Sequence, residues 1–254
     1  MTTTASKIKD WIQKTGFPLE MEVAAALQHE GFNVVQSHIF QDSQQEKSRE
    51  IDVFATDPDF LGIVDITFVI ECKASSKPWV VLKQAAGPIQ YNKLLSFGVT
   101  SEPARSELVK RVFNKSVPDY VDFGVTAGYG LRQAFSDDGE SSGSICIPLL
   151  KAAHQITQSP GVKKLPRHAF CFPVLVVSSP LFECSLKADG ELEISEVNAS
   201  SFLLESHIPD RVGCTIQIVS RLNLEKFALE ARAIASKIRA DFQAVQDRYI
   251  PPSA

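Results

Sequence analysis

The chain has 254 residues, 44% of them hydrophobic and 22% charged, which is typical of one large soluble globular domain or two small ones. Its net charge of −4 excludes a general attraction to nucleic acid, so any contact with a polyanion must come from a local basic patch or from metal ions. The five cysteines are never spaced C-x-x-C, and neither a zinc site nor a disulfide framework follows from them. The N-terminus lacks the apolar core of a signal peptide, and no apolar run approaches the roughly 18 residues that span a bilayer. We therefore expect a cytoplasmic protein without membrane contact.

The N-terminal half alternates between helical and strand-like patterns. Its predicted elements are, in chain order, a helix at 18–30, strands at 32–40, 50–55 and 63–72, helices at 81–97 and 101–115, and a short strand with its turn at 122–130. Pro18 opens the first helix and Gly31 ends it. The first two strands favour a hairpin with a long loop. The Gly87-Pro88 pair predicts a break in the helix that contains it.

The C-terminal half is richer in strands. Residues 136–144, SDDGESSGS, are almost free of apolar side chains and indicate a loop. The elements predicted after it are a helix to about 158, a basic turn at 163–168, strands within 170–179, 182–189, 191–198 and 214–222, and a helix at 223–243. The last helix holds its apolar residues at helical spacing, with charged residues on the other side.

This alternation of helices and strands favours an α/β fold, a central mixed sheet with helices on both sides. Residues 136–144 are too short a connection to indicate two separate lobes. We therefore expect one domain over residues 1–254. In it, residues 1–135 carry the candidate site, and residues 145–254 form a β-rich half that ends in the amphipathic helix.

The strand predicted at 63–72 places charged residues on one of its faces. Side chains alternate across a strand, so Glu71 and Lys73 point the same way, roughly 7 Å apart at their Cα atoms. A carboxylate beside an ammonium suits a metal ligand next to a lysine that orients water. The alternative is a solvent-facing ion pair on an edge strand.

Asp52 lies in the preceding strand between Ile51 and Val53, and we expect it to project opposite to both. If this strand pairs with the next, Asp52 and Glu71 converge on one cation. Carboxylate oxygens of this kind suit Mg²⁺ or Mn²⁺, with waters and a substrate phosphate completing the coordination.

The first helix offers two glutamates. Glu20 shares a helical face with the apolar residues that follow it at i+3, i+4 and i+7, whereas Glu22 lines up with a more solvated stripe that includes His29. Glu20 is therefore the predicted inward carboxylate, with Glu22 as the alternative. A first-turn glutamate that complements the helix dipole is an equally simple interpretation.

The order of these motifs is similar to that of the PD-(D/E)XK nuclease superfamily, in particular its Mrr-like and RecB-like branches. Glu20 followed by Gly31-Phe32 resembles the first helix and strand of Mrr-like proteins, and R-E-I-D (49–52) with E-C-K (71–73) resembles the family's Asp and E-x-K elements. The resemblance covers about residues 17–97. Ile51 stands where the family name has proline.

The resemblance implies a restriction-endonuclease-like sheet and a metal-dependent nuclease. Asp52, Glu71 and the backbone carbonyl of Cys72 would hold Mg²⁺ or Mn²⁺. Lys73 would orient the attacking water, and Glu20 would bind a second cation or a metal-bound water. DNA is the expected substrate, in repair, restriction or anti-phage defence, although the residues leave RNA and single strands open.

Four further residues are candidates for nucleic-acid contact. Lys77 and Lys83 follow the E-C-K strand closely enough to reach a phosphate backbone. The family often has a glutamine on the next helix, a role for which Gln84 and Gln90 are both candidates. The basic cluster of Lys163, Lys164, Arg167 and His168 is interpreted as a solvated turn.

A second function remains open, because a fold does not fix an activity. The same scaffold can lose catalysis and persist as a module that binds nucleic acid or a protein partner. The presence of all three core residues favours the enzyme. A partner protein that selects the target would fit the acidic composition, and two sites per duplex would favour a homodimer.

Overall fold

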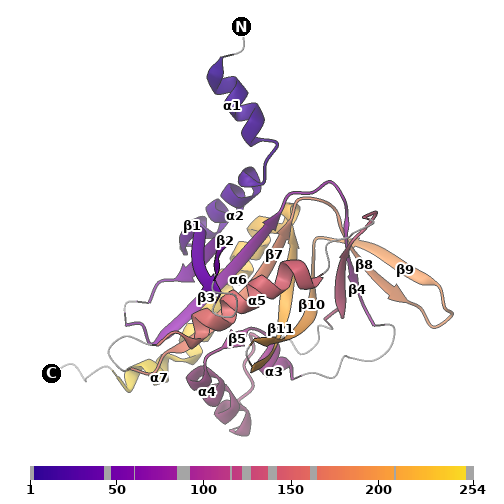
Figure 1. Cartoon of the computed structure of the whole chain (residues 1–254). Coiled ribbons are helices and arrows are strands. Elements are labelled where there is room, and N and C mark those ends of the chain that lie inside the picture. The colour runs from indigo at the N-terminus through magenta and orange to yellow at the C-terminus, as the bar shows by residue number, and fades with distance from the viewer. Residues whose placement is uncertain are drawn as a thin grey trace.

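The computed structural model describes residues 3–42, 47–59, 61–84, 92–114, 116–121, 127–136, 142–160, 165–208 and 210–249. A seven-stranded mixed sheet forms its centre (Figure 1). Its strands are β1 (Asn33–Asp42), β2 (Lys47–Asp57), β3 (Val64–Lys73), β5 (Val99–Thr100), β7 (His168–Val177), β10 (Ala199–Ile208) and β11 (Asp210–Ser220). The order is β1-β2-β3-β7-β11-β10, with β5 paired to β7. The sheet thus joins strands from both halves of the chain.

Strand β7 lies at the middle of this sheet, parallel to both of its neighbours β3 and β11. All ten of its residues are buried. A strand covered on both faces needs no polar alternation, which explains its nearly continuous apolar sequence HAFCFPVLVV. The outer pairs β1–β2, β2–β3 and β10–β11 are antiparallel.

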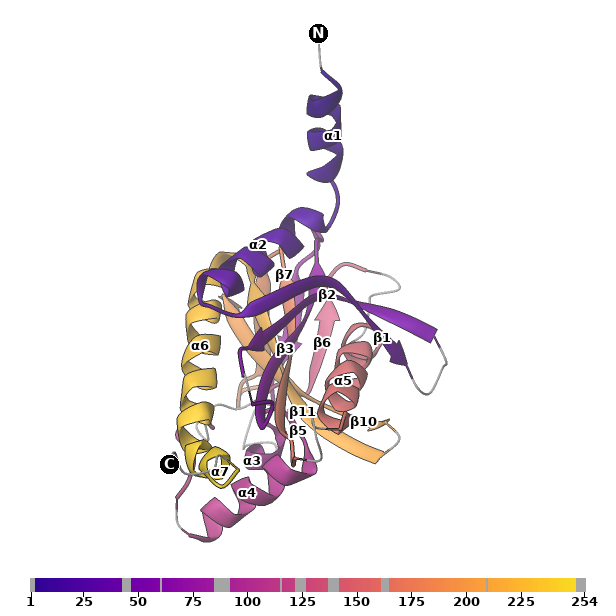
Figure 2. The same cartoon turned by 90° about the vertical axis from the view of Figure 1, so that its left-hand side faces the viewer.

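Helices cover both faces of the sheet (Figure 2). The helices are α1 (Thr4–Ile12), α2 (Phe17–His29), α3 (Lys93–Ser96), α4 (Glu102–Phe113), α5 (Ser142–Gln158), α6 (Leu224–Asp241) and α7 (Gln243–Asp247). Apolar residues of α2 and α6 pack with Phe68 and Ile70 of β3, whereas those of α5 pack with Val69. The predicted mixed sheet with helices on both sides is therefore confirmed. Within the described residues, no helix is both long and apolar enough to cross a membrane.

A second, four-stranded sheet lies beside the first, in the order β6-β4-β8-β9. Its strands are β4 (Trp79–Leu82), β6 (Gly130–Gln133), β8 (Leu181–Leu186) and β9 (Leu192–Val197). The prediction of a helix from residue 81 is wrong, because Trp79 and Val81 are fully buried at strand spacing, and among the described residues of 81–97 only 93–96 are helical. Gly87-Pro88 lies outside the described residues.

Several other boundaries differ from those predicted. Helix α1 and strand β10 were not predicted at all, and strand β6 begins only at the last residue of the segment 122–130, most of which lies outside the described residues. Helix α5 begins at Ser142, inside the predicted loop 136–144. Strand β6 is fixed by its pairing with β4, which is distant in sequence, whereas helix α1 has no buried residue.

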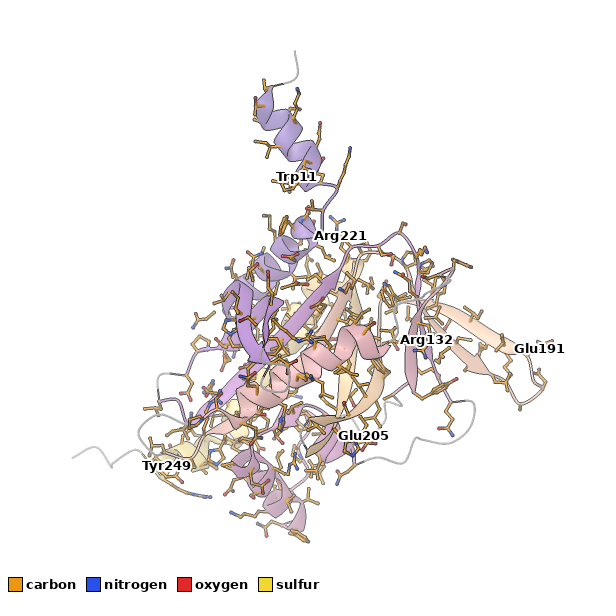
Figure 3. The ribbon with its side chains drawn as sticks, in the orientation of Figure 1. Trp11, Arg132, Glu191, Glu205, Arg221 and Tyr249 are labelled. Carbon is orange, nitrogen blue, oxygen red and sulfur yellow. The ribbon has the colours of Figure 1, made fainter. Side chains whose placement is uncertain are left out.

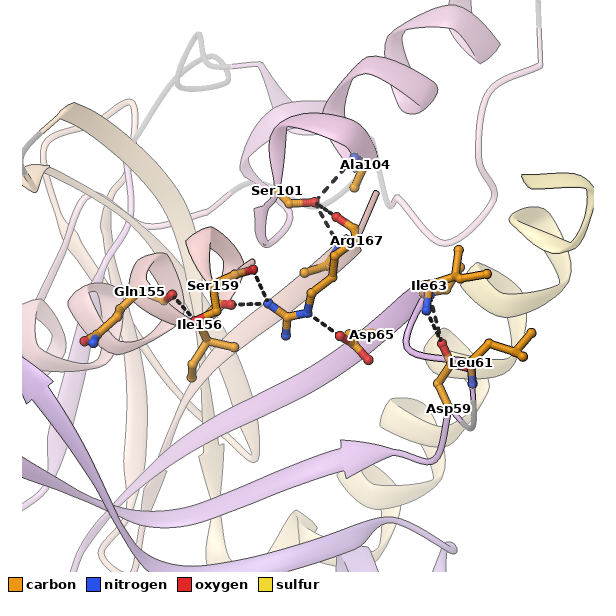
Figure 4. Close-up of polar contacts among 12 residues, drawn as sticks. Asp59, Leu61, Ile63, Asp65, Ser101, Ala104, Gln155, Ile156, Ser159 and Arg167 are labelled. Carbon is orange, nitrogen blue, oxygen red and sulfur yellow. Dashed lines mark hydrogen bonds and ion pairs between the residues drawn. The ribbon is translucent and has the colours of Figure 1, made fainter. Parts of the chain in front are cut away.

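Arg167 and His168 do not form a solvated turn, and that interpretation is wrong for both. The Arg167 guanidinium contacts the Asp65 carboxylate of β3 and donates to carbonyls at the end of α5, including that of Ser159 at 3.2 Å (Figure 4). A cation at a helix C-terminus meets its unpaired carbonyls favourably. His168 is buried as the first residue of β7. Lys163 and Lys164 lie outside the described residues.

Gly128 joins the two sheets at a point with no room for a side chain. It donates to the Ser201 carbonyl at 2.7 Å, and an added Cβ would lie 2.5 Å from Val81 Cγ1 and 2.8 Å from the Leu82 carbonyl oxygen. Gly128→Ala is therefore expected to lower the free energy of unfolding by about 1–3 kcal/mol. Urea denaturation measures the change. Gly130→Ala is the control, because its Cβ would meet nothing closer than 3.8 Å, and equal losses in both variants would contradict the steric explanation.

Candidate active site

Glu71 and Lys73 lie side by side at the end of β3. They point to the same face, and Lys73 Nζ lies 2.9 Å from Glu71 Oε1, with both side chains partly exposed. A cavity of about 360 Å³ opens beside them toward the first turns of α5. Its lining consists of Arg49, Glu50, Glu71, Lys73, Ser144, Ile145 and Pro148. This pair is thus neither buried in the core nor fully solvated.

Asp52 lies where the side chains of strand β2 change the face of the sheet to which they point. Ile51 and Val53 would share a face of a regular strand, yet Ile51 packs on the α5 side of the sheet and Val53 on the α2–α6 side. On the neighbouring strand, Ser37 stands opposite and adopts a left-handed conformation with φ of 52°. The prediction that Asp52 projects opposite to both apolar neighbours is therefore wrong, because those neighbours point to different faces.

This change of face brings the Asp52 carboxylate to the backbone of β3. The β2–β3 ladder pairs Val53 with Ile70, so that Asp52 and Glu71 are the next opposed positions. There Asp52 Oδ2 accepts a hydrogen bond from the backbone N–H of Cys72 at 2.7 Å. This bond holds Asp52 beside the E-C-K segment, where the sequence predicts it.

Glu20 faces the same region from the first turn of α2. Its neighbours Leu19, Val23 and Ala24 are buried against the sheet. Burial is the main cause that raises the pKa of Glu20, and the nearby carboxylates of Asp52, Glu50 and Glu71 add to it. Of the two glutamates considered, the structure thus directs Glu20 toward the cluster.

Glu22 points elsewhere. Its carboxylate receives the guanidinium of Arg221, with Arg221 Nε at 2.6 Å and Nη2 at 2.5 Å from the two oxygens. Arg221 belongs to the short 3-10 helix η2 (Arg221–Asn223), which precedes α6. Glu22 therefore has a structural partner of its own, away from Asp52.

The electrostatic character of this region is that of crowded carboxylates around one ammonium group. Burial raises the pKa of Asp52, against the lowering effect of the Cys72 N–H and of Lys73. Burial also raises the pKa of the Cys72 thiol, and the charges of Asp52, Glu20 and Glu71 raise it further. The thiol therefore stays protonated, and the backbone carbonyl is the oxygen that Cys72 can offer to a cation.

The donor chemistry fits a hard divalent cation. Within the described part of the chain, no group of three His, Cys, Asp or Glu side chains is arranged to hold a metal ion. Mg²⁺, however, is usually bound through one or two carboxylates together with waters and substrate phosphates. Asp52 and Glu71 supply two carboxylates, and a cation would offset the burial and the neighbouring negative charges that raise the pKa of Glu20 and Asp52. These residues therefore suit a cation that shares its coordination with a substrate.

Three residues at this site were not identified from the sequence. Glu50 adds to the charge that acts on Glu20 and Asp52, and Arg49 and Ser144 line the cavity. Arg49 also binds the buried Asp42 at 2.9 Å, which fixes its side chain near the tip of the β1–β2 hairpin. Arg49 and Glu50 belong to the R-E-I-D motif itself, so their closeness to Asp52 could have been inferred from the sequence. Nothing in the sequence connects Ser144 with β3.

The residues proposed for nucleic-acid contact are spread out. Lys77 is exposed in the loop after β3, close in sequence to the site. Lys83 instead pairs with Glu183 of β8 at 2.9 Å and lines a different cavity of about 390 Å³. Gln84 is exposed just after β4, and Gln90 lies outside the described residues. The structure thus brings neither Lys83 nor Gln84 into the lining of the carboxylate cavity.

The cluster is assembled from three elements that are separate in sequence. Helix α2 contributes Glu20, strand β2 contributes Glu50 and Asp52, and strand β3 contributes Glu71 and Lys73. Any chemistry assigned to it depends on this geometry and charge. The chain was compared with protein-family models, with curated proteins and with solved structures, and no match was found in any of the three.

Proposed function

We propose that this protein is a metal-dependent nuclease that hydrolyses phosphodiester bonds, with DNA as the expected substrate. The observation that carries the proposal is the convergence of Asp52, Glu71 and Lys73 where β2 turns away from β3. The order of α2, the β1–β2 hairpin and β3 agrees with the resemblance to PD-(D/E)XK nucleases. We therefore interpret the mixed sheet as restriction-endonuclease-like.

Each residue has a role that follows from its position. The carboxylates of Asp52 and Glu71 and the backbone carbonyl of Cys72 would hold Mg²⁺ or Mn²⁺. When bound, such a cation supplies charge stabilisation to the phosphate and a lowered pKa to a bound water. Lys73 Nζ lies 2.9 Å from the Glu71 carboxylate. A water or a phosphate oxygen beside that carboxylate would therefore be within hydrogen-bonding reach of Lys73.

Two further features suit a phosphate in the cavity beside Glu71. Glu20 stands over the cluster, where its carboxylate would accept a hydrogen bond from the attacking water or bind a second cation. Ser144, Ile145 and Pro148 of the first two turns of α5 also line the cavity, which therefore lies near the positive end of this helix dipole.

Cleavage assays test the proposal directly. Plasmid, linear duplex, single-stranded DNA and RNA should be incubated with the protein and Mg²⁺ or Mn²⁺. We expect cleavage of at least one DNA form, complete inhibition by EDTA, and recovery when excess Mg²⁺ is restored. Cleavage that persists in EDTA would contradict a metal-dependent mechanism.

One observation favours the second function, a binding module without catalysis. Glu71 is already paired with Lys73, and no preformed group of three metal-binding side chains is present among the described residues. Titration calorimetry with Mn²⁺ separates the two functions. The nuclease should bind the ion and lose that binding in Asp52→Asn, whereas a catalytically degenerate module should bind no metal.

A further inference from the structure

Helix α1 extends away from the rest of the molecule (Figures 1 and 2). None of its nine residues, all of them described, is buried. Trp11 is 61% exposed and stands clear of the domain (Figure 3). A helix of this length is marginal in water without packing, so an apolar face left open on it indicates a missing partner.

The open face of α1 is both apolar and bordered by basic residues. Ile8, Trp11 and Ile12 follow one another at helical spacing and form one stripe. Lys7 and Lys9 flank this stripe. The segment 4–16 carries three lysines against a single aspartate, so the helix presents an apolar ridge with a positive border.

A groove of complementary character lies between α2 and α6. Its cavity measures about 810 Å³. Its floor is apolar and includes Ala25, Ala228 and Leu229, and Leu222 at its end is 89% exposed. Three glutamates line it, Glu22, Glu30 and Glu225, against one arginine, Arg221. The groove is therefore an apolar channel with a net negative border.

The dimensions also agree. Nine helical residues span about 13 Å, and the groove-lining residues of α2 and its C-cap, from Glu22 to Glu30, cover nearly the same length. The apolar surface continues along α2, where Phe17 and Met21 are exposed.

The connection between α1 and α2 holds α1 away from its own groove. Residues 13–16 are fixed by a series of hydrogen bonds. Lys14 and Thr15 donate to carbonyls of α1 at 3.1 and 2.9 Å, and the N–H of Leu19 donates to the Gly16 carbonyl at 3.1 Å. This bonded turn sets the direction of α1, so the helix is presented to another molecule.

We propose that the groove between α2 and α6 receives helix α1 of a second copy of this chain, so that two copies exchange their N-terminal helices. The ridge and the groove are complementary in shape, polarity and charge, and both belong to the same chain. In a dimer with a two-fold axis, helix α1 of each copy would fill the groove of the other, so that both apolar surfaces would be covered. Glu20 lies in the first turn of α2, so the interface would border the carboxylate cluster of each copy.

Disulfide trapping between two single variants tests this exchange. Ile8→Cys in one preparation is mixed with Leu229→Cys in another and oxidised, and the products are separated on a non-reducing gel. A covalent dimer is expected at roughly tenfold the yield obtained when Phe113→Cys on α4 replaces Leu229→Cys, because docking raises the local thiol concentration. Wild type controls for the native cysteines, of which only Cys184 is not buried.

Two outcomes would overturn the proposal. A double variant, Ile8→Cys with Leu229→Cys, that forms a disulfide within one chain and no covalent dimer would mean that α1 folds back onto its own groove. Yields no higher than those of the Phe113→Cys control would mean that α1 does not dock there.

Sedimentation equilibrium gives an independent measurement. Trp11→Asp and Leu229→Asp should each raise the dissociation constant of the dimer by about 30-fold or more, as for a central interface residue. Phe113→Asp, on an exposed position of α4, should leave it unchanged. A monomeric wild type would overturn the proposal. Neither experiment measures cleavage, so its outcome is independent of the nuclease assignment.

Discussion

Replacement of Glu71 by glutamine is expected to reduce metal-dependent cleavage by about 10²- to 10³-fold, the scale seen when one electrostatic contact to a transition state is removed. The amide keeps the shape of the side chain but removes one of the two carboxylates that lie where the pairing of β2 with β3 ends. It also removes the negative charge that pairs with the Lys73 ammonium at 2.9 Å. Initial rates at saturating Mg²⁺, on the substrate that wild type cleaves best, measure the loss.

Glu183→Gln is a matched control for this variant. Glu183 also lies on a strand and pairs with a lysine, Lys83, at the same 2.9 Å, and its side chain is 29% exposed, against 21% for Glu71. The control removes an ion pair of the same length outside the carboxylate cluster, although Glu183 also accepts a hydrogen bond from Ser200 Oγ at 2.5 Å. It should change stability as Glu71→Gln does while leaving cleavage intact. Equal rates in wild type and Glu71→Gln would remove Glu71 from the site.

The face on which Glu71 and Lys73 lie could be predicted from the sequence, because β3 is a regular strand. Strict alternation places Phe68 and Ile70 under α2 and α6, and the two charged residues on the other side. The choice of Glu20 over Glu22 follows from helical spacing in the same way. Where an element is regular and long, its period alone fixes which side chains face the core.

The position of Asp52 could not be predicted by the same rule. Its strand turns over between Ile51 and Val53, opposite the left-handed Ser37 of β1. Serine carries no sequence signal for that conformation comparable to glycine. The break arises from the pairing of three strands at once, and only the assembled sheet reveals it.

Two further errors concern the strands β4 and β10. The last two residues of β4 were predicted as helical because a strand of four residues is too short to establish a period, and β10 was missed because its apolar residues Phe202, Leu203 and Leu204 are consecutive and do not alternate with polar ones. Strand β4 owes its structure to β8, which is distant in sequence, whereas β10 forms a hairpin with β11, the next strand of the chain. Pairing partners of this kind override local propensity.

Removal of the Asp57 carboxylate is expected to cause the largest loss of stability. Asp57 ends β2, its side chain is 3% exposed, and it binds two arginines of α6, Arg232 and Arg239, the latter with Nε at 2.6 Å. Breaking a buried ion pair from one side leaves charge without compensation and costs about 3–5 kcal/mol. Because both arginines remain partly exposed, we expect Asp57→Ala to lower the free energy of unfolding by about 3 kcal/mol, at the lower end of this range.

Asp119→Ala separates this effect from the general loss of a negative charge near α6. Asp119 pairs with Lys237 of the same helix at 3.0 Å, but its side chain is 75% exposed. An exposed pair contributes at most about 1 kcal/mol, so this variant should unfold almost as wild type does. Denaturant titration followed by circular dichroism measures both variants. If they lose the same stability, Asp57 does not anchor α6 to the sheet, and apolar packing of Phe227 and Ile238 against β3 and β7 must hold the helix alone.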